Sequence, residues 1–184
     1  MVTVILIEGK SNPHIMDIQL IEGSLVIDEL QRFLKGLSSI ASEHDVIIQG
    51  MDAGKIAGKA HIDHAISKAM KAMENGTNIA KDLGVEMMRY ASGKKQIGEA
   101  FSIGLSEGRL DVVFIIIGAP VNVGEAAKKI SSLVELSDVL KYSVSKNEQL
   151  ISQFSITDAE LEAVGEDRIP ELVLERVALV DILK

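Results

Sequence analysis

The apolar run from Val112 to Ile117 is the feature that most constrains the fold of this 184-residue chain. Six residues are too few to cross a bilayer, because a membrane-spanning helix needs about 20 apolar residues. A short apolar run of this kind is typical of a buried strand. Hydrophobic residues make up 47% of the chain and aromatic residues only 3%, so aliphatic side chains must form the core. The sequence therefore predicts a buried strand within an aliphatic core.

The residue pattern also predicts the other strands and helices. Strands are expected at residues 2–8, 16–21 and 45–49, with an edge strand at 142–144 and a turn at 11–13. Apolar residues that recur at three and four predict helices at 24–40, at about 55–73, from Thr77 or Asn78 to 91, and at 96–105, 123–136 and 146–154. Thr157 is expected to cap a short helix, and Pro170 to lie in the first turn of the last helix. The predicted fold is a single α/β domain of the α+β type over residues 1–184, with a small mixed or antiparallel sheet and about six to eight helices.

The charge and the cysteine content of the chain limit the classes of function that it can have. The net charge of −8 argues against general binding of nucleic acid. Residues 51–100 differ, since they hold 8 Lys/Arg against 6 Asp/Glu, whereas the remaining residues hold 11 against 21. The absence of cysteine excludes disulfides, thiolate metal sites and a cysteine nucleophile. We expect a cytoplasmic protein without a membrane partner, because no span and no secretory leader can be recognised.

The segment from Arg89 to Ile97 interrupts two helical patterns with Ser, Gly, two Lys and Gln. Gly93 can adopt positive φ at little steric cost and is therefore expected to end the first helix. Lys94, Lys95 and Gln96 are then expected to converge on one small patch. Such a patch favours an anion or a nucleotide as its ligand.

Other candidate sites depart from the patterns that their chemistry requires. Residues 50–59 place Gly50, Gly54 and Gly58 before lysines, but a phosphate-binding loop has four residues between its glycines and then Lys and a hydroxyl residue. A stand-alone small-molecule or nucleotide-binding protein that uses this loop stays as the alternative reading. The cluster at residues 61–64 (His61, Asp63 and His64) would need further ligands to hold zinc. No nucleophile-and-base set is recognisable, and we expect no enzymatic activity, cofactor or metal.

Several blocks resemble the smallest-subunit family of the KEOPS (EKC) complex, the TPRKB-type binders of the kinase-like PRPK subunit. The main block is Glu86 to Ile97 (EMMRYASGKKQI), which matches the family signature of a helix, Ala-Ser-Gly, a basic residue and Gln-Ile. Further similar blocks are residues 61–69 (HIDHAISKA), 78–81, 154–157 and 172–180. The resemblance covers roughly residues 45–184.

The resemblance implies a non-catalytic subunit of the complex that makes threonylcarbamoyladenosine in tRNA. Such subunits bind the kinase-like ATPase subunit and hold the 3′ CCA end of tRNA. The tRNA-binding residues that it implies here are Lys59, His61, Arg89, Lys94, Lys95 and Gln96. The residues expected to bind the partner subunit are Ile97, Phe101, Ile103 and Val173. A protein–protein adaptor without RNA affinity is a third reading, which the acidic total charge favours.

Overall fold

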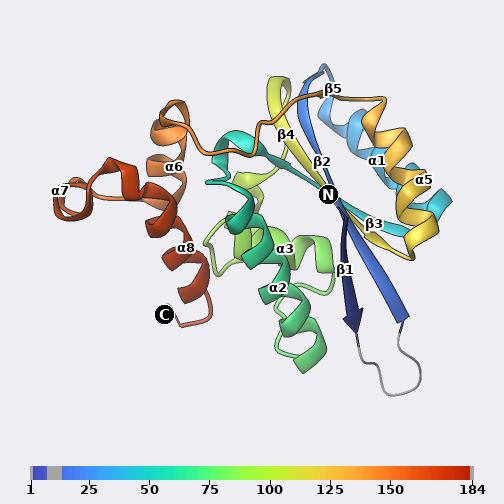
Figure 1. The fold of residues 1–184 in the computed structure, drawn as a ribbon, viewed down its shortest axis with the longest axis horizontal. Coiled ribbons are helices and arrows are strands. Elements are labelled where there is room, and N and C mark those ends of the chain that lie inside the picture. Colours follow the sequence, from blue (N-terminus) through green and yellow to red (C-terminus); the bar gives the residue numbers. More distant parts are fainter. Residues whose placement is uncertain (1, 8–13, 183–184) are drawn as a thin grey trace. The chain divides into compact units, whose positions relative to one another are not determined.

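The computed structural model of the protein describes residues 2–7 and 14–182, with side chains from residue 16 onward. It divides into two compact units, which are treated one at a time (Figure 1). The first unit comprises Met1–Met51 with Leu105–Val139, and the second comprises Asp52–Gly104 with Leu140–Lys184. The turn expected at residues 11–13 lies outside the described residues. No helix in the described part of the chain is both long and apolar enough to cross a membrane.

The first unit is built on a sheet with strand order β1-β2-β4-β3, in which β5 also pairs with β2. Its central pair is antiparallel from Asp17 opposite Gly118 to Ile27 opposite Gly108. This antiparallel sheet and the helices around it confirm the predicted α+β fold. The strands are β1 Val2–Ile7, β2 His14–Ile27, β3 Val46–Asp52, β4 Gly108–Gly118 and β5 Glu135–Leu136.

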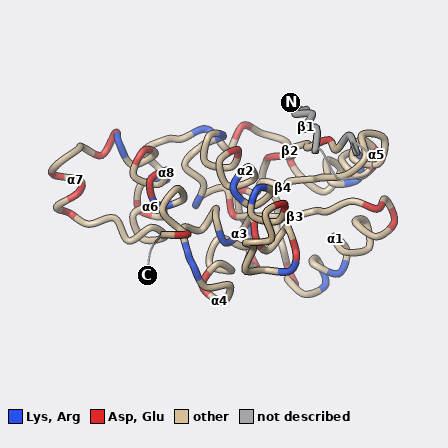
Figure 2. The backbone as a smooth tube through the Cα atoms, turned by 90° about the horizontal axis from the view of Figure 1, so that it is seen from below, with Lys and Arg blue, Asp and Glu red and all other residues tan. Residues whose placement is uncertain are grey.

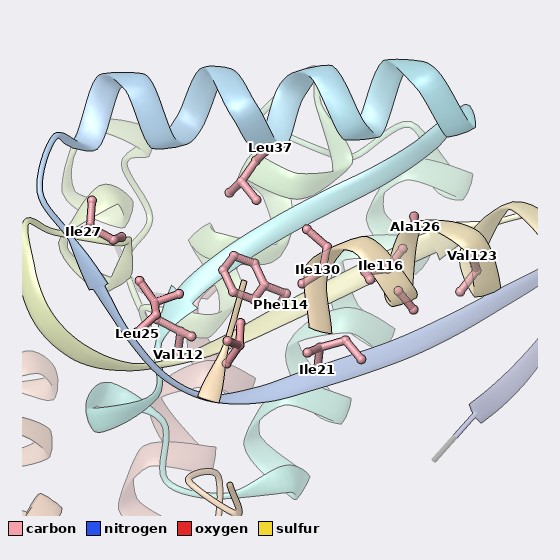
Figure 3. Packing of buried hydrophobic residues seen from close by; sticks show 12 residues of the cluster. Ile21, Leu25, Ile27, Leu37, Val112, Phe114, Ile116, Val123, Ala126 and Ile130 are labelled. Carbon is pink, nitrogen blue, oxygen red and sulfur yellow. The ribbon is translucent and has the colours of Figure 1, made fainter. Parts of the chain in front are cut away.

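Two helices cover one face of this sheet, α1 (Leu30–His44) and α5 (Pro120–Ser131). Figure 3 shows the core that they form with the sheet: Leu37 of α1 and Ile130 of α5 point toward Phe114 of β4. The members of this cluster are almost all aliphatic, as the composition predicts. The buried strand predicted at residues 112–117 is confirmed, since all six of these side chains are fully buried.

The main differences from the predicted boundaries in the first unit concern α1 and α5. Ser24 does not cap a helix, because β2 continues to Ile27 and α1 begins only at Leu30. The pairing of β2 with β4 fixes Leu25 and Ile27 on the buried side of the strand while Val26 is exposed. The helix predicted at 123–136 begins at Pro120 and ends at Ser131, because residues 135–136 pair with β2 as β5.

The second unit is helical. Its main helices are α2 Lys59–Asn75, α3 Leu83–Ala91, α6 Asn147–Phe154, α7 Asp158–Val164 and α8 Ile169–Leu179. Short segments connect them: η1 Ala53–Lys55, α4 Ile97–Ala100, η2 Phe101–Ile103, η3 Val144–Lys146 and η4 Glu166–Arg168. Helix α2 packs against α3 and α8, and α6 packs against α8 (Figure 1). The predicted Thr157 cap and the position of Pro170 are confirmed.

The helix predicted from about residue 55 begins at Lys59, because residues 53–55 form the 3₁₀ turn η1, and three further predictions for the second unit need correction. Helix α3 begins at Leu83 with Asp82 as its cap, not at Thr77 or Asn78, because the Asp82 carboxylate accepts the amide of Val85. The helix predicted at 96–105 is only one turn of α4 followed by the 3₁₀ turn η2. Residues 142–144 form no strand, and Val144 begins the 3₁₀ turn η3.

Candidate functional site

The junction between α3 and α4 is a compact turn that depends on Gly93. This residue has φ of 68°, and the amide of Lys94 donates to the carbonyl of Arg89 at 3.3 Å, as in a Schellman-type helix end. A Cβ atom at position 93 would lie 3.1 Å from two ring atoms of Phe154. Both the backbone angle and the space therefore favour glycine here. The predicted helix stop at Gly93 is confirmed.

His61 of α2 supports this junction from inside the protein. Its Nδ1 accepts the amide N–H of Ala57 at 3.1 Å, and its Nε2 donates to the carbonyl of Ala91 at 2.8 Å. The ring also packs edge-on against Phe154, with 5.5 Å between centroids. Burial lowers the pKa of His61 to about 4, so the imidazole is neutral at pH 7. Because only 1% of the residue is exposed, the expectation that His61 contacts RNA does not fit its position.

Arg89 is also buried, with no exposed surface. Its Nε and Nη2 donate to one carboxylate oxygen of Glu86 at 3.1 and 2.7 Å, and Nη2 donates to Asp181 at 3.2 Å. The guanidinium lies 4.2 Å from the centre of the Tyr90 ring. Burial alone would lower the pKa of Arg89, but the hydrogen bonds with Glu86 and Asp181 raise it. The side chain is thus an internal cation, and its burial does not fit the expected direct contact with RNA.

Glu86 and Asp181 complete a group of charges that the sequence analysis missed. The second carboxylate oxygen of Glu86 accepts the amides of Ile79 and Ala80 at 3.3 and 2.8 Å, which fixes the loop before α3. Asp181 accepts from Tyr90 at 2.8 and 3.0 Å and from Lys68 at 3.1 Å. Burial and the bond to Asp181 raise the pKa of Tyr90 to about 12. The i,i+3 spacing of Glu86 and Arg89 was the available signal for this pair.

The two lysines of the junction line different depressions and do not converge on one patch. Lys94 lines a depression of 610 Å³ together with Lys55, Glu148 and Gln153, among others. Lys95 instead lines a pocket of 350 Å³ with Arg89 and Asp181. Consecutive residues after a left-handed glycine point in different directions, which explains the divergence. The junction therefore separates two depressions within the second unit.

Neither Lys94 nor Lys95 is paired with a carboxylate within the described residues. Figure 2 shows the stretch of Lys and Arg on the backbone that leads into α4. Gln96 is exposed at the cap position of α4. Lys59 differs, because both oxygens of Asp63 accept from its ammonium at 2.6 and 2.5 Å. The charge of Lys59 is thus partly neutralised, whereas the junction lysines keep theirs.

The four residues expected to bind a partner subunit divide into two kinds. Phe101 is 56% exposed, and Ile97 is partly exposed. Ile103 and Val173 are fully buried and belong to the interior. Only Phe101 and Ile97 can therefore contact another protein through their side chains as the molecule stands.

The glycine loop before α2 is occupied by its own contacts. The amide of Gly54 donates to Asp52, and the ammonium of Lys55 donates to the carbonyl of Ser102 at 2.7 Å. The buried ammonium of Lys146 donates to the carbonyls of Ala53 and Ile56. These contacts engage the amide of Gly54 and the ammonium of Lys55, two groups that a phosphate-binding loop would offer to its ligand. No group of metal-binding residues occurs among the residues with described side chains, and His61 is held elsewhere.

The fold and this junction define a small α+β protein with a lysine-bearing turn set on a rigid, buried support. A family model described as "Kinase binding protein CGI-121" matches residues 28–181. The "Regulatory protein Cgi121" of Methanocaldococcus jannaschii is 30% identical over 140 residues, which cover 74% of this chain and 84% of that protein. The chain therefore belongs to the CGI-121 family, which agrees with its resemblance to the smallest KEOPS subunits.

Proposed function

We propose that this protein is a non-catalytic subunit of a KEOPS-type assembly, where it binds the kinase-like ATPase subunit and holds the 3′ CCA end of tRNA. Membership of a family described as kinase binding supports the first contact. The description of the relative as a regulatory protein supports a role without chemistry of its own. The resemblance of residues 86–97 to the family signature is the reason to place the RNA end at the α3–α4 junction.

One observation carries the RNA part of the proposal: the unpaired lysines stand on a turn that the molecule holds rigid. The imidazole of His61 donates to the carbonyl of Ala91 at the end of α3. The buried ion pair of Glu86 with Arg89 joins two residues within the same helix. Because the backbone of the turn is held in place, it loses little freedom when the lysines meet a phosphate, which favours binding. Lys94, Lys95 and Gln96 thus contact the RNA, while His61 and Arg89 position them. Lys59 contributes less because of Asp63.

Holding one end of tRNA serves the assembly through effective concentration. A tRNA bound by its 3′ end keeps its anticodon arm near a distant active site on another subunit. The local cationic turn makes this possible on an acidic protein, because phosphate contact depends on nearby charge. The binding protein needs no catalytic group for this task.

The test is a fluorescence titration with tRNA, with and without its CCA end, at several salt concentrations. The wild type should prefer the tRNA with CCA. The double variant Lys94→Glu and Lys95→Glu should abolish that binding with little change of melting temperature. If each lysine meets one phosphate of a single strand, their loss removes about 1.4 from the slope of log affinity against log salt.

The matched control reverses two other exposed lysines, Lys35→Glu and Lys141→Glu, and changes the net charge equally. It should keep CCA-dependent binding. Equal loss in both double variants would mean that only total charge matters, and unchanged affinity in the junction variant would reject the site. A wild type that binds the ATPase subunit but no tRNA would instead establish the adaptor reading.

A further inference from the structure

Strand β1 forms one edge of the sheet in the first unit (Figure 1). Its one strand neighbour among the described residues is β2, with which it pairs antiparallel over its whole length. The backbone N–H and C=O groups on its other side therefore have no strand partner in the described part of the chain. An edge of this kind can accept a strand from another chain.

Half of β1 extends beyond the rest of the sheet. The pairing of β2 with β4 begins at Asp17, which lies opposite Gly118, the last residue of β4. The last three residues of β1 pair with residues 14–16 of β2, where β4 has already ended. A ribbon of only two strands is marginally stable in water. Further strands would therefore stabilise this end of the sheet.

The sequence of β1 does not protect this edge from association. Edge strands of soluble proteins often carry charged residues or proline, which discourage pairing with other chains. Residues 2–7 (VTVILI) contain neither, although charged residues make up 25% of the chain. All of them except Leu6 are β-branched, which favours strand structure. The residue types thus favour pairing at the free edge of β1.

A second copy of this chain is the partner that matches the edge. When two copies of β1 run antiparallel with all residues paired, Val4 of one copy lies opposite Ile5 of the other, and each remaining pair also contains an aliphatic residue and no charge. Two copies repel each other, since each has a net charge of −8. An uncharged strand lets them meet without placing carboxylates opposite each other, and like charges in that position are destabilising.

The same register supports the two extended ends. Residues 5–7 of one copy would lie against residues 2–4 of the other, which pair with residues 17–19 of β2. Those β2 residues are themselves paired with β4. Each extended end is therefore placed beside the part of the other copy that the full sheet supports.

We propose that β1 is a dimerisation edge, which pairs antiparallel with β1 of a second copy and joins the two sheets into one. This twofold pairing uses the same edge on both copies, so assembly stops at the dimer. A six-residue edge belongs to the small interfaces, below roughly 1,200 Å² in total, and the dissociation constant is in the micromolar range, about 1–100 μM. Both β1 and β2 precede residues 28–181, which match the family model, and the dimer needs neither the kinase-like subunit nor tRNA.

The test is sedimentation equilibrium of the full chain at concentrations across this range. The wild type should change from the monomer mass to the dimer mass, without larger species. Val4→Lys and Ile5→Glu each put a charge at the centre of the pairing without a counter-charge, and each should raise the dissociation constant at least about tenfold. An equal mixture of the two variants should associate again, because their opposite charges face each other. Such rescue requires that both variants are folded.

Val26→Lys and Val26→Glu are the matched controls, since they add the same charges at a position of β2 that is 58% exposed. Both should leave the dissociation constant unchanged. A further measurement needs no substitution: amide hydrogen exchange of residues 2–7 in the wild type should slow as the concentration rises through the dissociation constant.

A wild type that stays monomeric over this range would overturn the proposal and leave a strand of another protein as the occupant of the edge. Assembly beyond the dimer would show that β1 pairs with β3, the opposite edge of the sheet, and would overturn the twofold pairing. A dimer whose exchange at residues 2–7 does not depend on concentration would also overturn it, as would folded variants whose mixture stays monomeric.

Discussion

The imidazole of His61 joins the start of α2 to the end of α3, because its Nε2 donates to the carbonyl of Ala91 at 2.8 Å. The same ring accepts the amide of Ala57 at Nδ1, so its tautomer is fixed by its two partners. The carbonyl of Ala91 is one of the groups that a helix end leaves without a partner inside the helix. A neutral, buried histidine therefore supplies the hydrogen bond that a carbonyl at the end of α3 would otherwise lack.

The stability of the protein should depend on the protonation of His61. Its pKa is about 4 in the folded state, against about 6.5 in an unfolded chain. Between these values the unfolded state binds the proton and the folded state does not. The stabilising contribution is thus fully present above pH 6.5 and is lost as the pH falls toward 4, by about 3 kcal/mol in total. Urea denaturation at several values between pH 7.5 and 4.5 measures this loss.

Two variants separate His61 from the other titrating groups. His61→Gln should lower stability at pH 7.5 and flatten its decline between pH 6.5 and 4.5. His64→Gln changes an exposed histidine one turn away and should leave the decline as in the wild type. An NMR titration in which every histidine shows a pKa near 6.5 would contradict the burial argument.

Gly93→Ala should destabilise the protein more than an alanine at another left-handed glycine. Gly76 has nearly the same φ, 67° against 68°, but open space around its Cβ position. Gly76→Ala therefore reports the strain of the left-handed backbone alone. We expect a net loss of about 1 kcal/mol, because alanine also lowers the conformational entropy of the unfolded chain, which offsets part of the strain. At position 93 the new methyl group also meets the buried Phe154 ring at 3.1 Å, which adds about 1–3 kcal/mol of overpacking. Thermal denaturation of both variants measures the difference, and equal losses would show that Phe154 moves aside freely.

The sequence predicted elements better than their ends, and residues 21–30 show why. Val26 fits a helical spacing with Leu30 four residues later, whereas Leu25 fits an alternation with Ile27 and Ile21. The partner strand decides between the two patterns, and Leu25 lies opposite Leu110 of β4. That pairing joins residues 85 positions apart, so no local pattern contains it. Tertiary context overrides propensity here.

The sequence predicted the backbone turn at the junction, but not the positions of the side chains around it. Gly93 revealed the helix end, because few other residues adopt its conformation. The directions of Lys94 and Lys95 depend on the turn geometry, and the burial of His61 and Arg89 depends on Phe154, Asp181 and Glu86. A motif that names residue types does not distinguish a side chain that touches a ligand from one that supports it.

Arg89→Met should destabilise the protein by about 3–5 kcal/mol, because it leaves the carboxylate of Glu86 buried without its cation. The double variant Glu86→Gln and Arg89→Met should be less destabilised than this single variant, since it also removes the buried carboxylate that has lost its cation. The exposed pair Glu125 and Lys128 has the same i,i+3 spacing and offers a matched control. Lys128→Met should change the free energy of unfolding by less than about 1 kcal/mol. Urea denaturation at pH 7 gives all three values, and a loss in Arg89→Met as small as the control would show that water reaches Glu86.

Phe101→Asp should weaken binding of the kinase-like ATPase subunit if η2 forms part of that contact. Phe101 is an exposed aromatic side chain, and desolvating such a ring often provides a large part of the binding free energy at an interface. Its removal should therefore cost at least about 2 kcal/mol, or roughly thirtyfold in affinity. Isothermal titration calorimetry with the purified partner measures this change. Val121→Asp is the control, at an apolar position of α5 that is 77% exposed, and it should leave the affinity unchanged. Loss of binding in the control alone would show that the partner contacts α5 and not η2.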